Sequence, residues 1–400
     1  MARWDRRSST AVPLVGVVLV LALVLALSRS SQDVVLYKHY ASFELHRPAL
    51  HSWPREYPAL AGIFFLLPAA LPMPYRAGLA LVLAAVLLVL VAAGDRSGPD
   101  GAWARRLVIY LGLGTVWVLF ARFDLLPALA VLLAVERARS GRWRTAWSWA
   151  LLGGLLKLFP LLLLPGFFIA EWRASGRAPL RRILLASGAV ALVAGLQSAI
   201  APGSVLDPIR YELQRGFELS SVSGSLTLLM DPAHLHWTSA YGAREIVGHG
   251  HAEIAYFLLI AAAAGMALTW LLAARGRVAV ETTALAVLSV AVLGDKALAP
   301  QYLVWLAPLW AYWRLRWEWI AAAVLTTLVY PVSYALVSPG LLHSYALPTE
   351  LAALRNVLLL TGTVRWYLVS VRGPAHRDPG QAAGESPEAA VPSVGSGAGH

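Results

Sequence analysis

Long apolar stretches separated by short arginine-bearing links constrain this chain more than any other feature of its sequence. The first stretch, Ala11–Leu27, carries no charge over 17 residues, and a helix needs roughly 20 apolar residues to cross a bilayer. Similar stretches recur to near the C-terminus. Only 14% of the residues are charged, against about 25% in ordinary globular proteins. The sequence therefore predicts an all-α, polytopic integral membrane protein.

About twelve membrane helices are expected. The block 145–170 counts as two because Lys157 and Pro160 stand in its middle, where we expect a helical hairpin to turn. Residues 57–73 are apolar but interrupted by prolines, so they are predicted to form a juxtamembrane or re-entrant helix. The first segment is interpreted as a retained signal anchor because no clear cleavage site follows it. The remaining segments are 11–28, 76–94, 106–121, 125–138, 183–201, 253–274, 278–293, 300–313, 317–338 and 353–371.

The placement of arginine gives the orientation, since inner loops of membrane proteins are enriched in Lys and Arg. With a cytoplasmic N-terminus, 20 of the 33 basic residues fall in short inner segments, which explains most of the net charge of +11 without a nucleic-acid partner. The inner residues are Arg3, Arg6, Arg7, Arg96, Arg105, Arg106, Arg137, Arg139, Arg142, Arg144, Arg173, Arg177, Arg181, Arg182, Arg275, Arg277, Arg314, Arg316, Arg372 and Arg377.

This topology predicts a single membrane domain, residues 1–371, in a plasma membrane of bacterial type. Two large loops, 29–75 and 202–252, and a smaller one, 339–352, would face outward. The tail 372–400 is rich in Pro, Gly, Ala and Ser and is expected to be disordered and cytoplasmic. The absence of cysteine excludes disulfides and thiol chemistry.

The outer side carries the informative polar residues. All three lysines (Lys38, Lys157 and Lys296) map there. Asp33 follows the first membrane segment, and a carboxylate at the membrane surface can act as a general base toward a hydroxyl. The alternative is a solvated loop aspartate that caps a short helix.

Charged residues also interrupt the apolar stretches, where ionisable groups are costly and usually face a cavity or a partner. Arg122 and Asp124 lie between two short segments and could either pair with each other or face a substrate. Lys157 heads the predicted hairpin and needs an anion nearby. Asp295 and Lys296 form a similar break. Together the cations favour an outer-leaflet cavity for a phosphate-bearing lipid, and independent ion pairs are the alternative.

Histidine is concentrated on the same side. His343, in the last outer loop, is a candidate to hydrogen-bond a phosphate or a sugar. The pairs His234/His236 and His249/His251 have a spacing that can bind zinc, but no acidic or cysteine ligand pattern completes a site. No metal site and no cofactor are expected.

Five short motifs lie in the regions that contain these polar residues. They are Asp33-x-x-x-Tyr37-x-x-Tyr40-Ala41, Pro54-x-x-Tyr57-Pro58, Arg122-x-Asp124-x-x-Pro127, Lys157-x-x-Pro160 with Pro165, and Lys296-x-x-x-Pro300-Gln301-Tyr302-Leu303-x-Trp305-Leu306-x-Pro308. These segments resemble GT-C glycosyltransferases, and most closely glycosyltransferase family 87, the polyprenyl-phosphate-mannose-dependent α-mannosyltransferases. The resemblance extends over about residues 10–310, and Tyr57-Pro58-Ala59 departs from it where the family tends to have a second proline.

The resemblance implies transfer of a sugar, mannose in the family, from a polyprenyl phosphate to a lipid or glycan acceptor at the outer face, with inversion at the anomeric carbon. Asp33 would be the general base. The donor phosphate would be held by Lys157, Lys296, Arg122 and His343, and substrate would contact Tyr37, Tyr57, Asp124, Gln301 and Tyr302. Because a lipid phosphate is already a leaving group, no nucleotide-binding motif is required.

Two other functions share these features. A transporter or flippase of lipid-linked sugars would need the same cavity and cations, but such proteins often contain internal repeats, and none is evident here. A lipid-linked polysaccharide polymerase usually has an arginine-rich outer loop, whereas 202–252 contains only Arg210, Arg215 and Arg244. A structural role accounts least well for charges at membrane depth.

Overall fold

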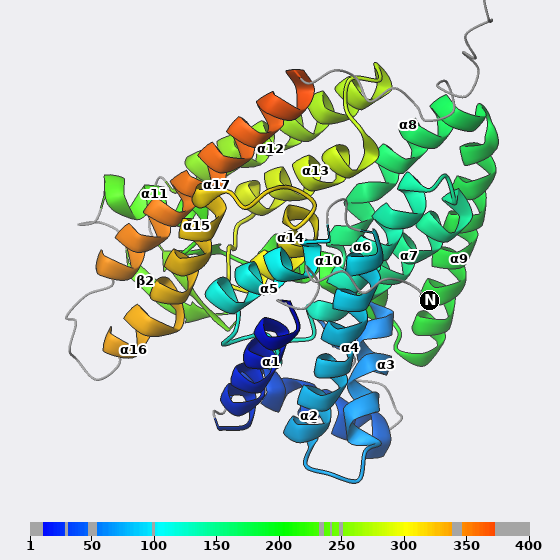
Figure 1. The fold of residues 1–400 in the computed structure, drawn as a ribbon. Coiled ribbons are helices and arrows are strands. Elements are labelled where there is room, and N and C mark those ends of the chain that lie inside the picture. Colours follow the sequence, from blue (N-terminus) through cyan, green and yellow to red (C-terminus); the bar gives the residue numbers. More distant parts are fainter. Residues whose placement is uncertain are drawn as a thin grey trace, which may run out of the picture.

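The computed structural model describes residues 11–28, 31–46, 54–97, 101–231, 236–240, 242–247, 251–337 and 346–372, and most of these residues are helical (Figure 1). Of the predicted tail 372–400, Arg372 is the last residue of α17, and residues 373–400 lie outside the described part. The helices are α1 (Ala11–Ser28), α2 (Gln32–His46), α3 (Ala59–Ala69), α4 (Tyr75–Ser97), α5 (Trp103–Gly114), α6 (Leu125–Arg139), α7 (Trp143–Leu156), α8 (Leu164–Ser175), α9 (Ala178–Ile200), α10 (Asp207–Gln214), α11 (Val222–Met230), α12 (His251–Ala274), α13 (Val280–Gly294), α14 (Tyr302–Trp310), α15 (Trp317–Thr327), α16 (Tyr334–Val337) and α17 (Ala346–Arg372).

Among the described residues, four helical segments are long and apolar enough to cross a membrane. They are Tyr75–Arg96, Ala178–Ile200, Glu253–Ala274 and Trp317–Val337. A fifth span is possible if α1 and the start of α2 form one segment, although the chain bends by 71° between them. Helix α3 is apolar but has only 11 residues, so it is too short to be a full span. The protein is thus a helical protein with membrane-spanning character, and the count of about twelve segments stays a prediction.

Helix α14 lies at the centre of the structure. All nine of its residues are buried, as expected of a helix that is apolar on every side. It packs against α5, α6 and α13. Carbonyls at its C-terminal end, which have no partner within a helix, accept the indole N–H of Trp103 at 3.1 Å and the guanidinium of Arg106 at 2.7 Å. These bonds join α14 to α5.

The chain breaks at Lys157, where the sequence predicts a turn. Helix α7 ends at Leu156, Lys157 is extended (φ −156°, ψ 138°), and the chain continues as a 3-10 turn, η2 (Phe159–Leu163), into α8. The turn packs back on α7 so closely that a Cβ on Gly154 would overlap Leu161. Because of this break, Lys157 lies between α7 and η2 and not in the interior of one long helix.

The fold is all-α as the sequence predicts, and the loop 202–252 adds one small β-sheet to it. In the described residues it has the order β1-β3-β2, with β1 (Phe217–Glu218), β2 (His236–Ala240) and β3 (Ala243–Val247) antiparallel. Gly242 has φ +71° in the turn between β2 and β3, a conformation that glycine adopts at no steric cost. The loop also contains a 3-10 turn, η3 (Ser204–Leu206), and helices α10 and α11.

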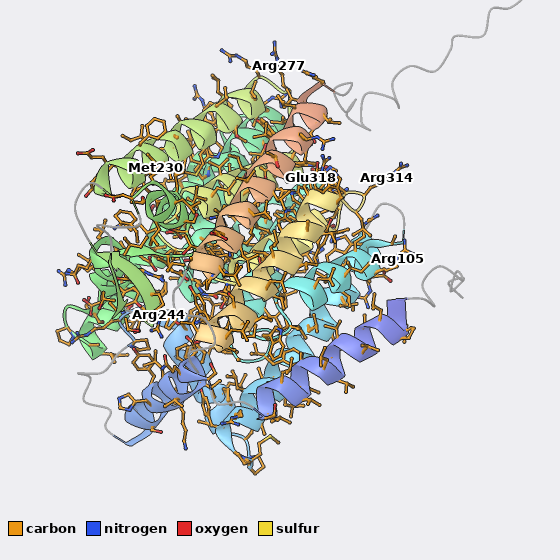
Figure 2. The ribbon with its side chains drawn as sticks, turned by 90° about the vertical axis from the view of Figure 1, so that its left-hand side faces the viewer. Arg105, Met230, Arg244, Arg277, Arg314 and Glu318 are labelled. Atoms are coloured by element: carbon orange, nitrogen blue, oxygen red, sulfur yellow. The ribbon has the colours of Figure 1, made fainter. Side chains whose placement is uncertain are left out.

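A backbone hydrogen bond anchors the sheet to the helical body: the Glu218 N–H of β1 donates to the carbonyl of Lys296 at 2.8 Å. Within the loop itself, the Leu219 N–H donates to the carbonyl of Arg244 in β3 at 2.8 Å. In Figure 2, Arg105, Arg277 and Arg314 lie along the upper and right-hand edge, while Arg244 lies on the left-hand side. The three arginines assigned to inner links are therefore at the opposite side from the arginine of the sheet.

Candidate active site

A cavity of about 1410 Å³ lies between the sheet-bearing loop and the helical body. Its wall is formed by the end of α1, the start of α2, the segment before α3, the turn between α5 and α6, the break at Lys157, α10, the segment before α14, and a π-helical turn, η4 (Leu328–Ser333). Six of the residues that the sequence analysis singled out line it, namely Asp33, Tyr57, Arg122, Lys157, Gln301 and Tyr302.

Asp33 forms an ion pair with Arg122 at the cavity wall. The Oδ2 of Asp33 lies 2.8 Å from Nη2 of Arg122, and the two side chains are 23% and 26% exposed. Asp33 stands in the first turn of α2, where the helix dipole stabilises a carboxylate. Burial alone would lower the pKa of Arg122, but the nearby Asp33 carboxylate raises it above its usual value. Arg122 therefore stays charged.

Lys157 has a buried anionic partner, as its position predicts. Its Nζ lies 2.7 Å from Oδ1 of Asp124, whose side chain is only 3% exposed. The same oxygen accepts the indole N–H of Trp305 at 2.6 Å. Arg122 and Asp124, which the sequence allows to pair with each other, instead pair with Asp33 and Lys157. Asp124 holds Lys157 and Trp305 in place and is not part of the cavity wall.

Three stacked rings form part of the wall. Trp305 stacks on Phe159 with centroids 4.0 Å apart and on Tyr302 with centroids 4.1 Å apart. The Nζ of Lys157 lies 4.9 Å from the Trp305 ring, within the range of a cation–π interaction. This stack fixes Lys157 between the aromatic wall and Asp124.

Tyr37 and Tyr57 belong to one aromatic cluster but have different positions in it. Tyr37 is 1% exposed and stacks on Phe65 at 4.4 Å. Its hydroxyl lies 3.4 Å from that of Tyr57, which does line the cavity. Tyr37 thus supports Tyr57 from behind and does not itself line the cavity.

Lys296 does not line the cavity either. Its Nζ donates to the carbonyls of Glu212, Leu213 and Arg215 at 3.4, 3.0 and 3.2 Å. These groups belong to the C-terminal end of α10, where carbonyls lack helical partners and a cation is favourable. Lys296 therefore caps α10. His343, the fourth candidate for the donor phosphate, lies outside the described residues.

The cavity also contains polar residues that sequence reasoning missed. Arg355 of α17 is fully buried and donates to the carbonyls of Ser220 and Leu298 and to Asn356 Oδ1. The sequence feature that could have identified Arg355 is a charged residue beside an asparagine within an apolar segment. The Nη2 of Arg215 lies 3.4 Å from Oε2 of Glu218. Both residues belong to the loop 202–252, and the sequence alone does not reveal which residues this loop contacts.

Two further carboxylates, Glu212 and Asp295, line the same cavity. Neither forms an ion pair with any described residue. Burial raises the pKa of Asp295 to about 6, and the Glu212 carboxylate adds to this effect, while Arg215 and the backbone N–H groups of Lys296 and Ala297 oppose it.

In the part of the chain that the structure describes, no group of three or more His, Cys, Asp or Glu side chains could hold a metal ion.

No protein-family model matches the sequence, and comparisons with curated proteins and with solved structures find no match.

Proposed function

We propose that this chain is an integral membrane glycosyltransferase of the GT-C type. It transfers a sugar, mannose by the family resemblance, from a polyprenyl phosphate to a lipid or glycan acceptor at the outer face of the membrane, with inversion. Asp33 is the general base, and Arg122 and Lys157 bind the donor phosphate. The proposal includes about twelve membrane segments, cytoplasmic termini and the outer loops 29–75, 202–252 and 339–352.

One observation carries this proposal. A candidate base, Asp33, and two candidate phosphate-binding cations, Arg122 and Lys157, come from three distant parts of the sequence and line one cavity. Ionisable side chains in a membrane protein usually face a cavity or a pathway, and groups with matched roles in one cavity are the basis on which an active site is inferred. A cavity of about 1410 Å³ also has room for two substrates.

The apolar part of the wall suits a lipid-linked donor. It is formed by Leu25 and Ala26 of α1, Val118, and Val329 and Pro331 of η4. An isoprenoid chain gains free energy from burial of its methylene and methyl groups against such residues. The phosphate at the end of that chain would lie where the apolar wall meets Arg122 and Lys157.

The proposed reaction assigns one step to each of these residues. Asp33 removes the proton of the acceptor hydroxyl, whose oxygen forms a bond to the anomeric carbon as the bond from that carbon to the phosphate oxygen breaks. Polyprenyl phosphate leaves with the bonding electron pair. Arg122 and Lys157 stabilise the negative charge that grows on the phosphate, which is where fixed charges accelerate such reactions most.

The test is a reconstituted assay. Purified protein in liposomes is given polyprenyl-phosphate sugars, mannose first, with crude lipid and glycan acceptors, and radiolabelled product is counted. The Asp33→Asn variant should lose at least 99% of the transfer rate, since loss of a general base costs about 10²–10⁴-fold. Asp207→Asn is the matched control, because Asp207 lies on the same wall and pairs with Arg210 at 3.4 Å. It should transfer at close to the wild-type rate.

Two results would contradict the proposal. If Asp33→Asn retains more than a few percent of the activity while folding normally, Asp33 is not the base. If the wild-type protein consumes none of the lipid-linked donors but moves them across the bilayer, the chain is a transporter.

A further inference from the structure

The loop 202–252 contains two short helices, α10 and α11, whose amphipathic character is inverted. A helix on the surface of a water-soluble domain turns its apolar side to the core and its polar side to solvent. In α10 and α11 the large apolar side chains are exposed, and polar side chains lie on the inward side. Water is therefore an unfavourable surrounding for the outward side of both helices.

Helix α10 has its polar residues on the cavity. Tyr211 and Glu212, among others, line the cavity wall. The outward side carries three apolar residues that do not line the cavity. They are Leu206, directly before the helix, Ile209 and Leu213, which are 51%, 47% and 71% exposed. Their spacing of three and four residues places them on one face.

Helix α11 shows the same inversion. Asn356 of α17 donates to Ser225 Oγ at 3.0 Å on its inward side, where Ser223 and Thr227 are also buried. Its outward side is apolar, and Met230 appears on the left-hand side of Figure 2, as does Arg244 of the sheet. The exposed residues are Leu226, Leu229 and Met230, at 42%, 48% and 67%.

Both exposed rows continue the apolar surfaces of helices that are long and apolar enough to cross a membrane. Helix α9 leads through η3 into α10, and its last turns expose Leu192, Leu196 and Ile200. Helix α11 packs against α12. The first turns of α12 expose Tyr256, Phe257 and Ile260. Exposed apolar side chains on a membrane-spanning helix contact lipid acyl chains, so the rows on α10 and α11 extend a surface that lipid already covers.

A lipid leaflet accounts for both rows better than a protein partner does. Exposed apolar patches of this kind mark contacts with proteins or with membranes. The two rows adjoin different spans, α9 and α12, and α8 packs against both of these spans. A bilayer surrounds every span, whereas a single protein partner would have to reach around α8.

We propose that α10 and α11 lie in the headgroup layer of the adjacent leaflet and bind phospholipid through their outward residues. Six side chains enter the acyl-chain region, namely Leu206, Ile209, Leu213, Leu226, Leu229 and Met230. Helix α10 then has lipid on one side and the cavity on the other. This inference rests on the membrane-spanning character of the chain and not on the proposed transferase function.

The absence of cysteine makes the position of each helix directly measurable, because a single introduced cysteine carries a nitroxide at one chosen site. Leu213→Cys and Met230→Cys are labelled and reconstituted in vesicles of phosphatidylcholine and phosphatidylglycerol. Electron paramagnetic resonance then compares collisions with O₂, which concentrates among acyl chains, and with a water-soluble Ni²⁺ chelate. Both labels should lie about 5–10 Å into the boundary between headgroups and acyl chains, where O₂ collides more often.

The matched control is Gln214→Cys. Gln214 follows Leu213 in α10 and is also exposed, but it lines the cavity. Its label should collide more often with the Ni²⁺ chelate than with O₂. Circular dichroism checks that each variant folds, and Ile209→Cys and Leu229→Cys replace the first pair if either member does not.

Two results would overturn the proposal. If the Ni²⁺ chelate reaches the labels at 213 and 230 as freely as the label at 214, both helices lie in water. If neither reagent reaches them, protein covers the rows, and a second copy of the chain is the occupant. Immersed labels in a protein that transfers no sugar would support the membrane contact and reject the transferase function, so the two proposals can fail separately.

Discussion

The pair between Lys157 and Asp124 allows the sharpest test of the site's architecture. We consider Lys157→Met, which keeps most of the volume of the side chain and removes its charge. Asp124 would then be a buried carboxylate, 3% exposed, whose remaining partner is the Trp305 indole. Removing one member of a buried ion pair costs about 3–5 kcal/mol. Because Lys157 itself is 19% exposed, we expect a loss near 3 kcal/mol.

A second substitution isolates the cause of that loss. In Lys157→Met/Asp124→Asn the asparagine Oδ1 still accepts the Trp305 N–H, but no buried charge is left. We therefore expect the double variant to be about 2 kcal/mol more stable than Lys157→Met alone, because it no longer contains an uncompensated buried charge. Unfolding by SDS in mixed micelles, followed by circular dichroism, measures these differences. Lys38→Met, at an exposed position of α2, is the control and should change stability by less than about 0.5 kcal/mol.

The refuting result is a double variant no more stable than Lys157→Met. It would mean that the charge of Asp124 is not compensated by Lys157, and that the ion pair does not hold this wall of the cavity.

Two further predictions concern Asp295 and Lys296, which are adjacent in the sequence. Lys296→Met should lower the free energy of unfolding by about 2 kcal/mol, since it removes a charged donor from three carbonyls at the end of α10. The variant should bind decyl phosphate, an anionic probe, as tightly as the wild-type protein. A tenfold loss of that binding would show that Lys296 belongs to the phosphate site. Asp295→Asn should remove a pH dependence. The folded protein raises the pKa of Asp295 from 3.8 to about 6, so between these values the folded state binds more protons than the unfolded state. The wild-type protein therefore loses stability as the pH rises from 4 to 7. The loss is at most about 3 kcal/mol, at about 1.4 kcal/mol per pH unit. Unfolding of both proteins at pH 4, 5, 6 and 7 measures the difference, and parallel curves would contradict the buried position of Asp295.

The sequence predicts the positions of charged breaks better than their partners. The break at Lys157 follows from one lysine and one proline inside an apolar block, which no continuous membrane helix accommodates at low cost. The need of Lys157 for an anion follows from the same burial. Which anion it meets depends on how α6 and α7 pack, so the pairing of Lys157 with Asp124 and of Arg122 with Asp33 required the structure.

Other differences have the same origin. Lys296 looks like a phosphate ligand in sequence because its capping partners, the carbonyls of α10, carry no side-chain signal. The strands β2 and β3 are short and lack a clear alternation of apolar and polar residues, so the sheet was missed. Gln301 is selected by resemblance, whereas its burial and the lack of a described hydrogen-bond partner for its Oε1 are visible only in the structure.

The ion pair between Asp33 and Arg122 has a kinetic consequence for the proposed reaction. The Oδ2 of Asp33 lies 2.8 Å from Nη2 of Arg122, so this oxygen is engaged by the guanidinium and not by an acceptor hydroxyl. An anionic donor that competes for Arg122 would release Asp33, so the base would become active only after the donor is bound. Two-substrate kinetics should then show compulsory order, with the lipid-linked sugar first, and an acceptor that arrives alone would meet a latent enzyme that leaves it unchanged.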